Sequence, residues 1–205
     1  MIARALHRLA AQPGVYDLTQ CLVGVPRVRR RVAARIAGLG LSGVVVDLGG
    51  GTGMFRSLWP SPRCYVCLDL DPAKLRRFRR KFPADATVLA DATRAPFAPG
   101  SVDVVVCVFI AHHLADDGLS RLLDEGARVL RPGGRLVFLD PVWDPDRPLA
   151  RLLWRYDRGS YPRTGTGLRH TVARRYDILH WEQFAVVHGY ALGIAARRAD
   201  PGDAS

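Results

Sequence analysis

The feature that most constrains the fold is a short apolar run that leads directly into a glycine-rich turn. Residues 44–48 read Val-Val-Val-Asp-Leu, and residues 49–53 read Gly-Gly-Gly-Thr-Gly. A short run rich in β-branched residues predicts a buried strand. Glycines let the following backbone turn sharply and approach a ligand closely. The spacing D-x-G-x-G-x-G differs from the dinucleotide pattern G-x-G-x-x-G, because the sixth position from Gly49 is Met54. It indicates a nucleotide-cofactor turn after the first strand, and a merely tight strand-to-helix turn is the alternative.

Strand and helix patterns alternate along the rest of the chain. The predicted strands cover residues 44–48, 64–70, 87–90, 103–109 and 135–139, and a final antiparallel pair covers 184–187 and 190–194. The predicted helices cover residues 26–39, 72–83 and 119–130, with a further one near 149–153. This alternation predicts an α/β fold built on a doubly wound, mostly parallel sheet.

The same patterns suggest how the chain is organised. We expect an N-terminal helical cap over residues 1–40, a cofactor-binding domain over 41–199 and a polar tail over 200–205. Residues 144–175 interrupt the regular alternation and are rich in Tyr, Arg and Gly. We expect this insertion to contribute to a substrate lid.

Acidic residues end the second and third predicted strands. Asp69 follows the glycine turn by about twenty residues, the spacing at which an acid can bind ribose hydroxyls. Asp91 ends the third strand, where it could accept a hydrogen bond from an adenine amino group. Each acid alone is also typical of a strand end or a helix cap. Together with Asp47 they place three acids at one edge of the predicted sheet.

Four segments in order resemble the class I S-adenosylmethionine-dependent methyltransferases. They are VVVDLGGGTG, CLDLDPAKL, LADATRAPFAPGSVDVVVCVFIAHHL and GARVLRPGGRLVFLD, and they run from Val44 to Asp140. The resemblance implies a Rossmann-like, seven-stranded sheet whose last strand is antiparallel. It also implies S-adenosylmethionine as the cofactor.

The resemblance assigns cofactor contacts to individual positions. Asp47 and the glycine turn would surround the amino-acid end, Asp69 the ribose, and Leu70 the adenine face. Asp91 and Ala92 would meet the adenine edge, Val108 and Phe109 would pass beneath the methionine portion, and Tyr16 would cover the cofactor from the N-terminal helix. The full set is Tyr16, Asp47, Gly49, Gly51, Gly53, Asp69, Leu70, Asp91, Ala92, Val108 and Phe109.

Two histidines follow the fourth predicted strand. His112 and His113 lie near where the methyl group should point, and Asp140 ends the neighbouring fifth strand. In related small-molecule O-methyltransferases, a His and an acid at these places can act as base and orienting group. The alternative is that the histidines only pack against or cap the next helix. In-line methyl transfer depends mainly on positioning, so a base is not obligatory.

The net charge of +11 comes almost entirely from arginine. A nucleic-acid binder could carry such a charge, and so could a protein attracted to acidic lipid. We expect a compositional bias towards Arg, because the arginines are scattered along the chain, and we expect the cluster at residues 27–35 to be a solvated helix face. No apolar run is long enough to predict a membrane span, and the first residues lack the pattern of a secretory signal.

The cysteines predict no metal site. Cys64 and Cys67 form a C-x-x-C pattern on a predicted strand, where positions i and i+3 point to opposite faces. No second pair completes a zinc site, so we expect free, buried thiols, which suit a cytoplasmic protein.

These features favour methyl transfer to oxygen or nitrogen of a small metabolite or lipid-like acceptor. A domain that binds S-adenosylmethionine without transferring its methyl group is one alternative. An RNA methyltransferase is another, but no RNA-binding module is visible in the sequence, and we expect no nucleic-acid partner. The sequence does not determine the acceptor or the oligomeric state.

Overall fold

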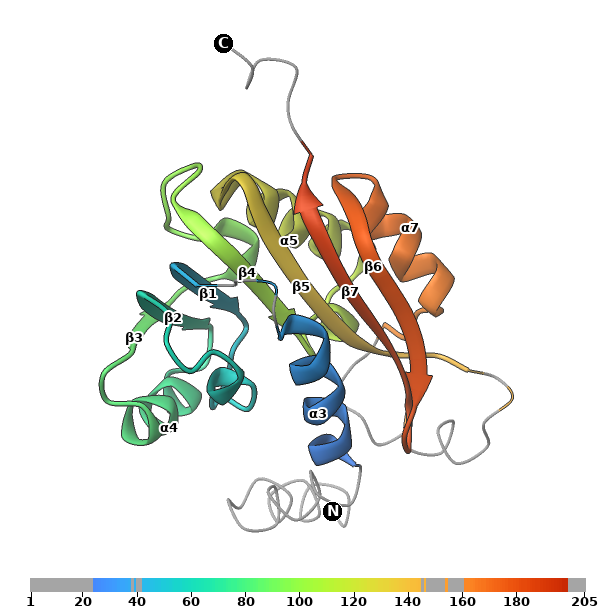
Figure 1. Cartoon of the computed structure of the whole chain (residues 1–205), viewed down its shortest axis with the longest axis horizontal. Coiled ribbons are helices and arrows are strands. Elements are labelled where there is room, and N and C mark those ends of the chain that lie inside the picture. Colours follow the sequence, from blue (N-terminus) through green and yellow to red (C-terminus); the bar gives the residue numbers. More distant parts are fainter. Residues whose placement is uncertain are drawn as a thin grey trace.

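A computed structural model describes residues 24–37, 39, 42–144, 146, 154 and 161–198 (Figure 1). Its strands are β1 Val44–Leu48, β2 Cys64–Asp69, β3 Ala86–Leu89, β4 Val102–Val108, β5 Leu130–Val142, β6 Tyr176–Ala185 and β7 Gly189–Arg197. Its helices are α3 Val25–Ile36, α4 Pro72–Lys81, α5 Asp116–Val129 and α7 Gly165–Ala173. Three single-turn 3₁₀ helices are η1 Arg56–Leu58, η2 Ala92–Arg94 and η3 Ala111–His113.

The strands form one seven-stranded sheet in the order β3-β2-β1-β4-β5-β7-β6. Strands β1 to β5 pair in parallel, and β7 pairs antiparallel with both β5 and β6. The chain places β2 and β3 successively on one side of β1 and then returns to place β4 on the other side. The carboxyl ends of β1 and β4 therefore meet where the strand order switches, and ligands bind at this point in such folds. The expected doubly wound, mostly parallel sheet with an antiparallel last strand is therefore confirmed.

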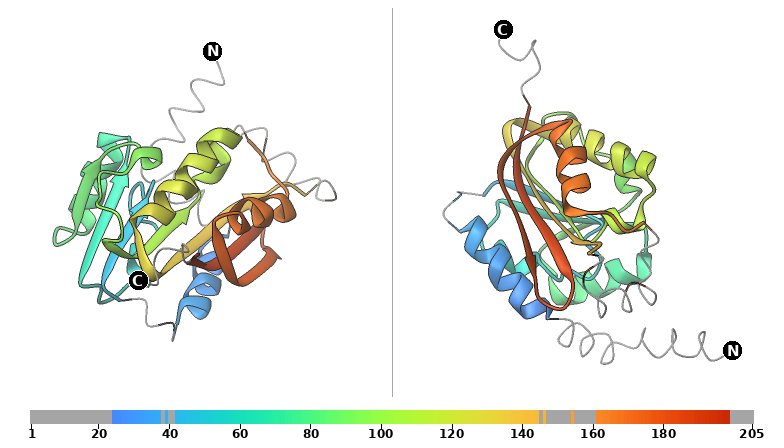
Figure 2. Two further views of the ribbon diagram at one scale, coloured as in Figure 1. Left: turned by 90° about the horizontal axis from the view of Figure 1, so that it is seen from above. Right: turned by 90° about the vertical axis from the view of Figure 1, so that its right-hand side faces the viewer.

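Helices cover both faces of the sheet (Figure 2). Val28, Val32 and Ile36 recur at helical spacing and pack α3 onto a cluster that also contains α4 and alternate residues of β1, β4 and β5. The intervening residues of the same strands pack against α5 and α7 on the opposite face. Burial on both faces explains why β1 and β4 are almost continuous apolar runs.

The ends of α3 and α4 follow from local residues. Asp71 caps α4, because its side chain accepts hydrogen bonds from the backbone N–H groups of Ala73 and Lys74. Gly24 precedes α3 with φ 80° and lies so close to Val186 that an added Cβ would be 2.3 Å from its Cγ1. This contact places the start of α3 against the turn between β6 and β7.

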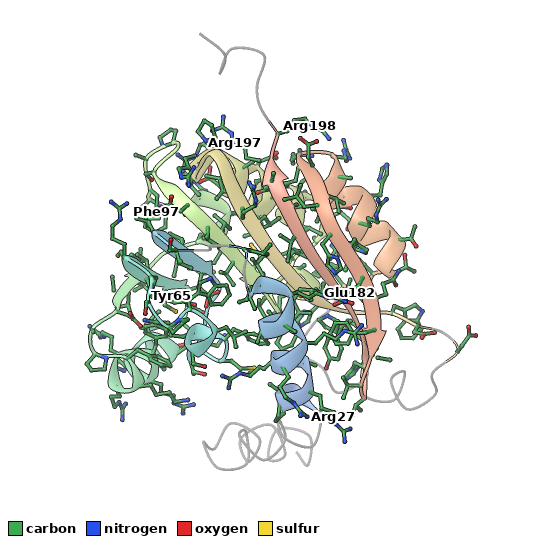
Figure 3. All side chains as sticks on the ribbon, viewed as in Figure 1. Arg27, Tyr65, Phe97, Glu182, Arg197 and Arg198 are labelled. Atoms are coloured by element: carbon green, nitrogen blue, oxygen red, sulfur yellow. The ribbon has the colours of Figure 1, made fainter. Side chains whose placement is uncertain are left out.

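Two arginines of α3 bind one carboxylate on the sheet. Arg31 and Arg35 both donate to Glu182 of β6, with shortest distances of 2.8 and 3.0 Å. Figure 3 labels Glu182 beside α3. These hydrogen bonds lower the pKa of Glu182 to about 2. The described part of the expected N-terminal cap is therefore integrated into the sheet domain.

Residues 165–173 of the expected lid form α7, whose Leu168 and Val172 are buried against the sheet, and a lid role for residues 144–175 stays a prediction. One expectation, that of buried thiols, needs correction. Cys64 is exposed because it opens β2 before the strand enters the core, whereas Cys67 and Cys107 are buried free thiols as expected. The helix expected near 149–153 and the tail at 200–205 lie outside the described residues.

Candidate active site

The glycine turn lies at the carboxyl end of β1. Gly49, Gly51 and Gly53 have φ values of 75°, 58° and 75°, a region that other residues rarely adopt. A Cβ on Gly49 would lie 2.4 Å from Ile110, and one on Gly53 would lie 2.7 Å from Phe78. At Gly51 the nearest atom would be 3.7 Å away. The turn is therefore packed at both ends and has room at its centre.

Asp69 lies beside that central glycine. Its carboxylate accepts hydrogen bonds from the backbone N–H groups of Gly51 at 3.0 Å and Asp71 at 2.8 Å, and Lys74 Nζ lies 3.8 Å away. The residue is nearly buried, so its orientation is fixed by these contacts. A fixed carboxylate at a strand end suits a vicinal diol, because each hydroxyl can donate to one oxygen.

Asp47 lies beneath the turn. Its carboxylate accepts a 2.7 Å hydrogen bond from the Tyr65 hydroxyl, and an added Cβ on Gly50 would lie 2.5 Å from it. Burial raises the pKa of Asp47 to about 7, with Tyr65 opposing the shift and the charge of Asp69 adding to it. Asp47 is thus placed to support the turn from below, and its contact with Tyr65 was not predicted.

The residues assigned to the adenine lie after β2 and β3. Leu70 is 66% exposed, which leaves an apolar side chain available to a flat ring. Asp91 accepts from the N–H and the hydroxyl of Thr93 and so caps η2, and Ala92 is buried. Asp91 therefore serves at least as a cap.

The end of β4 is conformationally strained. Phe109 has φ 57° and is the only non-glycine residue in the described segments with a positive φ. Its N–H donates to the Leu139 carbonyl, and its ring packs edge-on against Phe55 at 5.5 Å between centroids. Val108 before it is buried. Strain of this kind is found at ligand sites, where surrounding contacts hold it in place.

His112 and Asp140 form a buried pair. His112 Nδ1 lies 3.1 and 3.2 Å from the two Asp140 oxygens, and the Ala111 N–H donates to the same carboxylate at 3.2 Å. Burial raises the pKa of Asp140, and the contact with His112 partly offsets the shift. His113 is exposed, and its ring lies 4.0 Å from that of His112. The sequence left either histidine as the partner of Asp140, and the structure shows His112 hydrogen-bonded to it.

Arg163 holds the turn that carries His112. Its guanidinium donates to the carbonyls of Ala111 at 2.9 Å and Leu114 at 2.7 Å, and it also pairs with Asp116. The expected lid range thus includes a residue that fixes η3. The sequence placed Arg163 in a Tyr- and Arg-rich insertion and offered no sign of these contacts.

Aromatic and imidazole rings surround the His112 pair. The Trp154 ring lies edge-on to the His112 ring, with 6.1 Å between centroids, and to the His188 ring, with 6.3 Å. The Trp143 ring lies 6.5 Å from the Trp154 ring. Trp154 is 8% exposed, and its indole N–H has no hydrogen-bond partner among the described residues. A buried donor without an acceptor is costly unless a ligand or water satisfies it.

Among the described residues, no group of three His, Cys, Asp or Glu residues is placed to hold a metal ion. None of the described helices is long and apolar enough to cross a membrane. Tyr16, expected to cover the cofactor, lies outside the described residues.

Comparison with known proteins agrees with this geometry. Residues 46–138 match the model of a methyltransferase domain. The chain is 38% identical over 138 residues to demethylmenaquinone methyltransferase of Beutenbergia cavernae, covering 63% of this chain and 56% of that protein. It is 31% identical over 181 residues to the ubiquinone/menaquinone biosynthesis C-methyltransferase of Pasteurella multocida, covering 80% and 64%. The chain thus spans less than two thirds of the length of these relatives.

A solved structure shows the same fold. The PH0226 protein of Pyrococcus horikoshii superposes with a TM-score of 0.69 at 16% identity, covering 84% of this chain and 91% of that one. The range matched by the methyltransferase-domain model contains the glycine turn and the acid at the end of β2. The chain therefore carries a methyltransferase domain, similar to those of the class I S-adenosylmethionine-dependent methyltransferases.

Proposed function

We propose that the chain transfers a methyl group from S-adenosylmethionine to a small, lipid-like acceptor that carries a hydroxylated aromatic ring. The observation that carries the proposal is the buried pair of His112 and Asp140 beside Trp154, at the edge of the sheet that also holds the glycine turn. The sequence favours oxygen or nitrogen as the atom that accepts the methyl group, and the names of the relatives add a ring carbon as a third candidate.

The residues at the ends of β1 and β2 fit the cofactor. Gly51 leaves space where a side chain would stand, and Asp69 presents a fixed carboxylate beside it. Leu70 offers an apolar contact for the adenine, and Phe109 closes the floor towards the methionine portion. Bound S-adenosylmethionine supplies an electrophilic methyl group on a sulfonium.

His112 acts as the base in this proposal. Its Nδ1–H donates to Asp140, which leaves Nε2 as the nitrogen that takes the proton from a ring hydroxyl. Loss of that proton gives a phenolate, which is nucleophilic at oxygen and at the neighbouring ring carbon. If carbon is methylated, the ring then loses its own proton at that carbon. The buried Asp140 stabilises the imidazolium, and the Trp154 N–H donates to an acceptor oxygen.

The test measures methyl transfer to a reduced, short-tailed demethylmenaquinone, with methyl-labelled cofactor and mass analysis of the product. We expect His112→Ala to lower turnover by about 10²–10⁴-fold with cofactor affinity nearly unchanged. His113→Ala is the matched control and should retain more activity, because His113 is exposed and the contacts with Asp140 that define the pair come from His112.

Asp140→Asn should impair the same step, so the double variant with His112→Ala should be little worse than His112→Ala alone. Turnover of the native protein should depend on pH across about pH 5 to about pH 9, because a general base must be unprotonated to act. A flat profile with a loss below about threefold would leave positioning as the only mechanism. Tight cofactor binding without transfer to any hydroxylated ring would favour a binding protein that lacks transferase activity.

A further inference from the structure

The unbalanced positive charge of the chain lies on one side of the sheet. Helix α3 carries five arginines and α4 carries six Lys or Arg residues, and neither helix contains an acidic residue. Their eleven charges equal the net charge of +11, so the remainder of the sequence is formally neutral. We call the cations of these two helices the basic face.

The opposite side of the sheet is different. Helices α3 and α4 share one hydrophobic cluster, whereas α5 and α7 share the other, so the two pairs cover opposite faces. Helix α5 contains four acids and two arginines, and α7 contains one arginine, which gives this side a charge close to zero. Figure 2 shows α3 on one side of the sheet and α5 and α7 on the other. Arginines added at random along the chain would not concentrate their excess charge in the helices on one side of the sheet.

Most of the basic face is available for contact with a partner. Glu182 binds Arg31 and Arg35, and Asp69 lies near Lys74. Within the segments that the structure describes, Arg30, Arg76 and Arg80 are exposed and form no ion pair. Exposed cations on two neighbouring helices form a surface of several charges that attracts a polyanion.

We propose that the basic face docks the protein on an anionic phospholipid surface. Each Lys or Arg near such a surface adds attraction, so a patch of this size gives substantial binding without any inserted segment. Neither helix presents an exposed aromatic ring, since Phe78 is the only aromatic residue in them and it is fully buried. Single-stranded nucleic acid is bound largely by stacking on such rings, so the composition of the face favours lipid.

The basic face also adjoins the edge where the acceptor enters. Helix α3 starts against Val186 in the turn between β6 and β7, and Gly189, which begins β7, pairs with Val142 at the end of β5. Helix α4 starts three residues after Asp69. Docking through these helices therefore brings the site close to the lipid from which a lipid-like acceptor comes. The choice of a lipid surface as the partner rests on the proposed function, because that function supplies the lipid-like acceptor.

The experiment measures sedimentation of the full chain with vesicles in the absence of cofactor and acceptor. We expect binding to vesicles of phosphatidylcholine with phosphatidylglycerol, no binding to phosphatidylcholine alone, and loss of binding as salt rises to about 0.5 M. The triple variant Arg30→Gln, Arg76→Gln, Arg80→Gln should weaken binding by up to about a hundredfold.

The control variant is Arg121→Gln, Arg169→Gln, Arg174→Gln, which removes the same charge from the side of α5 and α7 and should bind nearly as the native chain does. Equal losses in both variants, or no preference for anionic vesicles, would overturn the proposal. Salt-dependent binding to polyuridylate without vesicle binding would replace lipid by nucleic acid.

Methyl transfer to the short-tailed acceptor in the absence of vesicles separates this inference from the proposed function. Activity in solution without vesicle binding would refute the docking surface alone. Vesicle binding through the basic face without methyl transfer would refute the proposed acceptor alone.

Discussion

Asp47 shows how a residue beneath a binding loop can act through its own ionisation. Its carboxyl is enclosed by Tyr65 and the glycine turn, so its charged form lacks solvent and carries a second negative neighbour in Asp69. A charged Asp47 accepts a stronger hydrogen bond from Tyr65, and a neutral one is better accommodated by burial. The turn is therefore coupled to the protonation of a group near neutral pH.

The raised pKa of Asp47 predicts a stability that falls with pH. The pKa is about 7 in the folded chain against 3.8 as the ordinary value, so the folded state binds the proton more tightly. The contribution is fully present below about pH 4 and is lost as pH rises through about 7. We expect urea unfolding to show a loss of up to about 4 kcal/mol across this window, at about 1.4 kcal/mol per pKa unit.

Two variants test the assignment to Asp47. Asp47→Asn should remove most of this pH dependence, because the amide cannot ionise. Tyr65→Phe removes the hydrogen bond that lowers the pKa of Asp47, so it should move the loss to higher pH. An unchanged slope in Asp47→Asn would assign the effect to another group.

Asp69 leads to a prediction about cofactor affinity. Asp69→Ala should weaken binding of S-adenosylhomocysteine by about 1–3 kcal/mol in calorimetry, the range for hydrogen bonds to a charged group. Asp71→Ala is the control two residues away: it removes the cap of α4 and should cost about 1 kcal/mol of stability with affinity kept. Equal affinity of the Asp69→Ala and native proteins for S-adenosylhomocysteine would contradict the assigned ribose contact.

At the scale of elements, one arginine joins the segment before α7 to the turn η3. Arg163 binds the carbonyls of Ala111 and Leu114, the residues on either side of the two histidines. Arg163, within the segment expected to form a lid, therefore fixes the turn that carries the proposed base. Arg163 is a positioning residue in this account, because it acts through His112.

We expect Arg163→Lys to lower kcat by about tenfold while KM for the cofactor stays nearly unchanged, since a 1 Å shift of a catalytic group has a cost of this size or larger. Steady-state kinetics with both substrates varied measures this split. Arg175→Lys is the matched control, because Arg175 makes a similar two-pronged contact with Asp124 on the surface, far from His112 in the sequence. If Arg175→Lys lowers kcat equally, loss of stability rather than positioning explains the effect.

The elements also show what a single sequence could predict. Strands β1, β2 and β4 were located to within about two residues, because burial on both faces makes them continuous apolar runs. Strand β6 was predicted much too short, since it is an edge strand whose exposed and half-buried residues include Asp177, Leu179 and Glu182. Helix α7 was missed because it opens Gly-Thr-Gly and buries few large side chains.

The features of the candidate site also divide into those that the sequence predicted and those that it did not. The glycine turn, Asp69 and the pairing of His112 with Asp140 followed from strand order, because carboxyl ends of neighbouring parallel strands meet at one edge. The contacts of Tyr65 with Asp47 and of Arg163 with η3 did not follow from any periodicity. Each contact joins residues of different elements, and it depends on the orientation of a side chain, which only the packing of the folded chain determines.

At the scale of the whole molecule, the positive charge is distributed unevenly between the two sides of the sheet, which the composition alone does not reveal. The sequence suggested a general bias towards arginine, and the cluster at residues 27–35 was taken as one solvated helix face. The fold places α4 on the same side of the sheet as that cluster, which neither helix pattern predicts by itself. An asymmetric charge orients an approaching molecule before contact, and this orientation weakens as salt screens it.

The position of β7 has a consequence for how the chain folds. This strand lies between β5 and β6 and pairs with both, yet it follows all the other described strands in the sequence. Until β7 is in place, β5 and β6 each keep an open edge on the side that β7 will occupy. A folding intermediate without β7 would therefore expose these edges to pairing with each other or with a neighbouring chain.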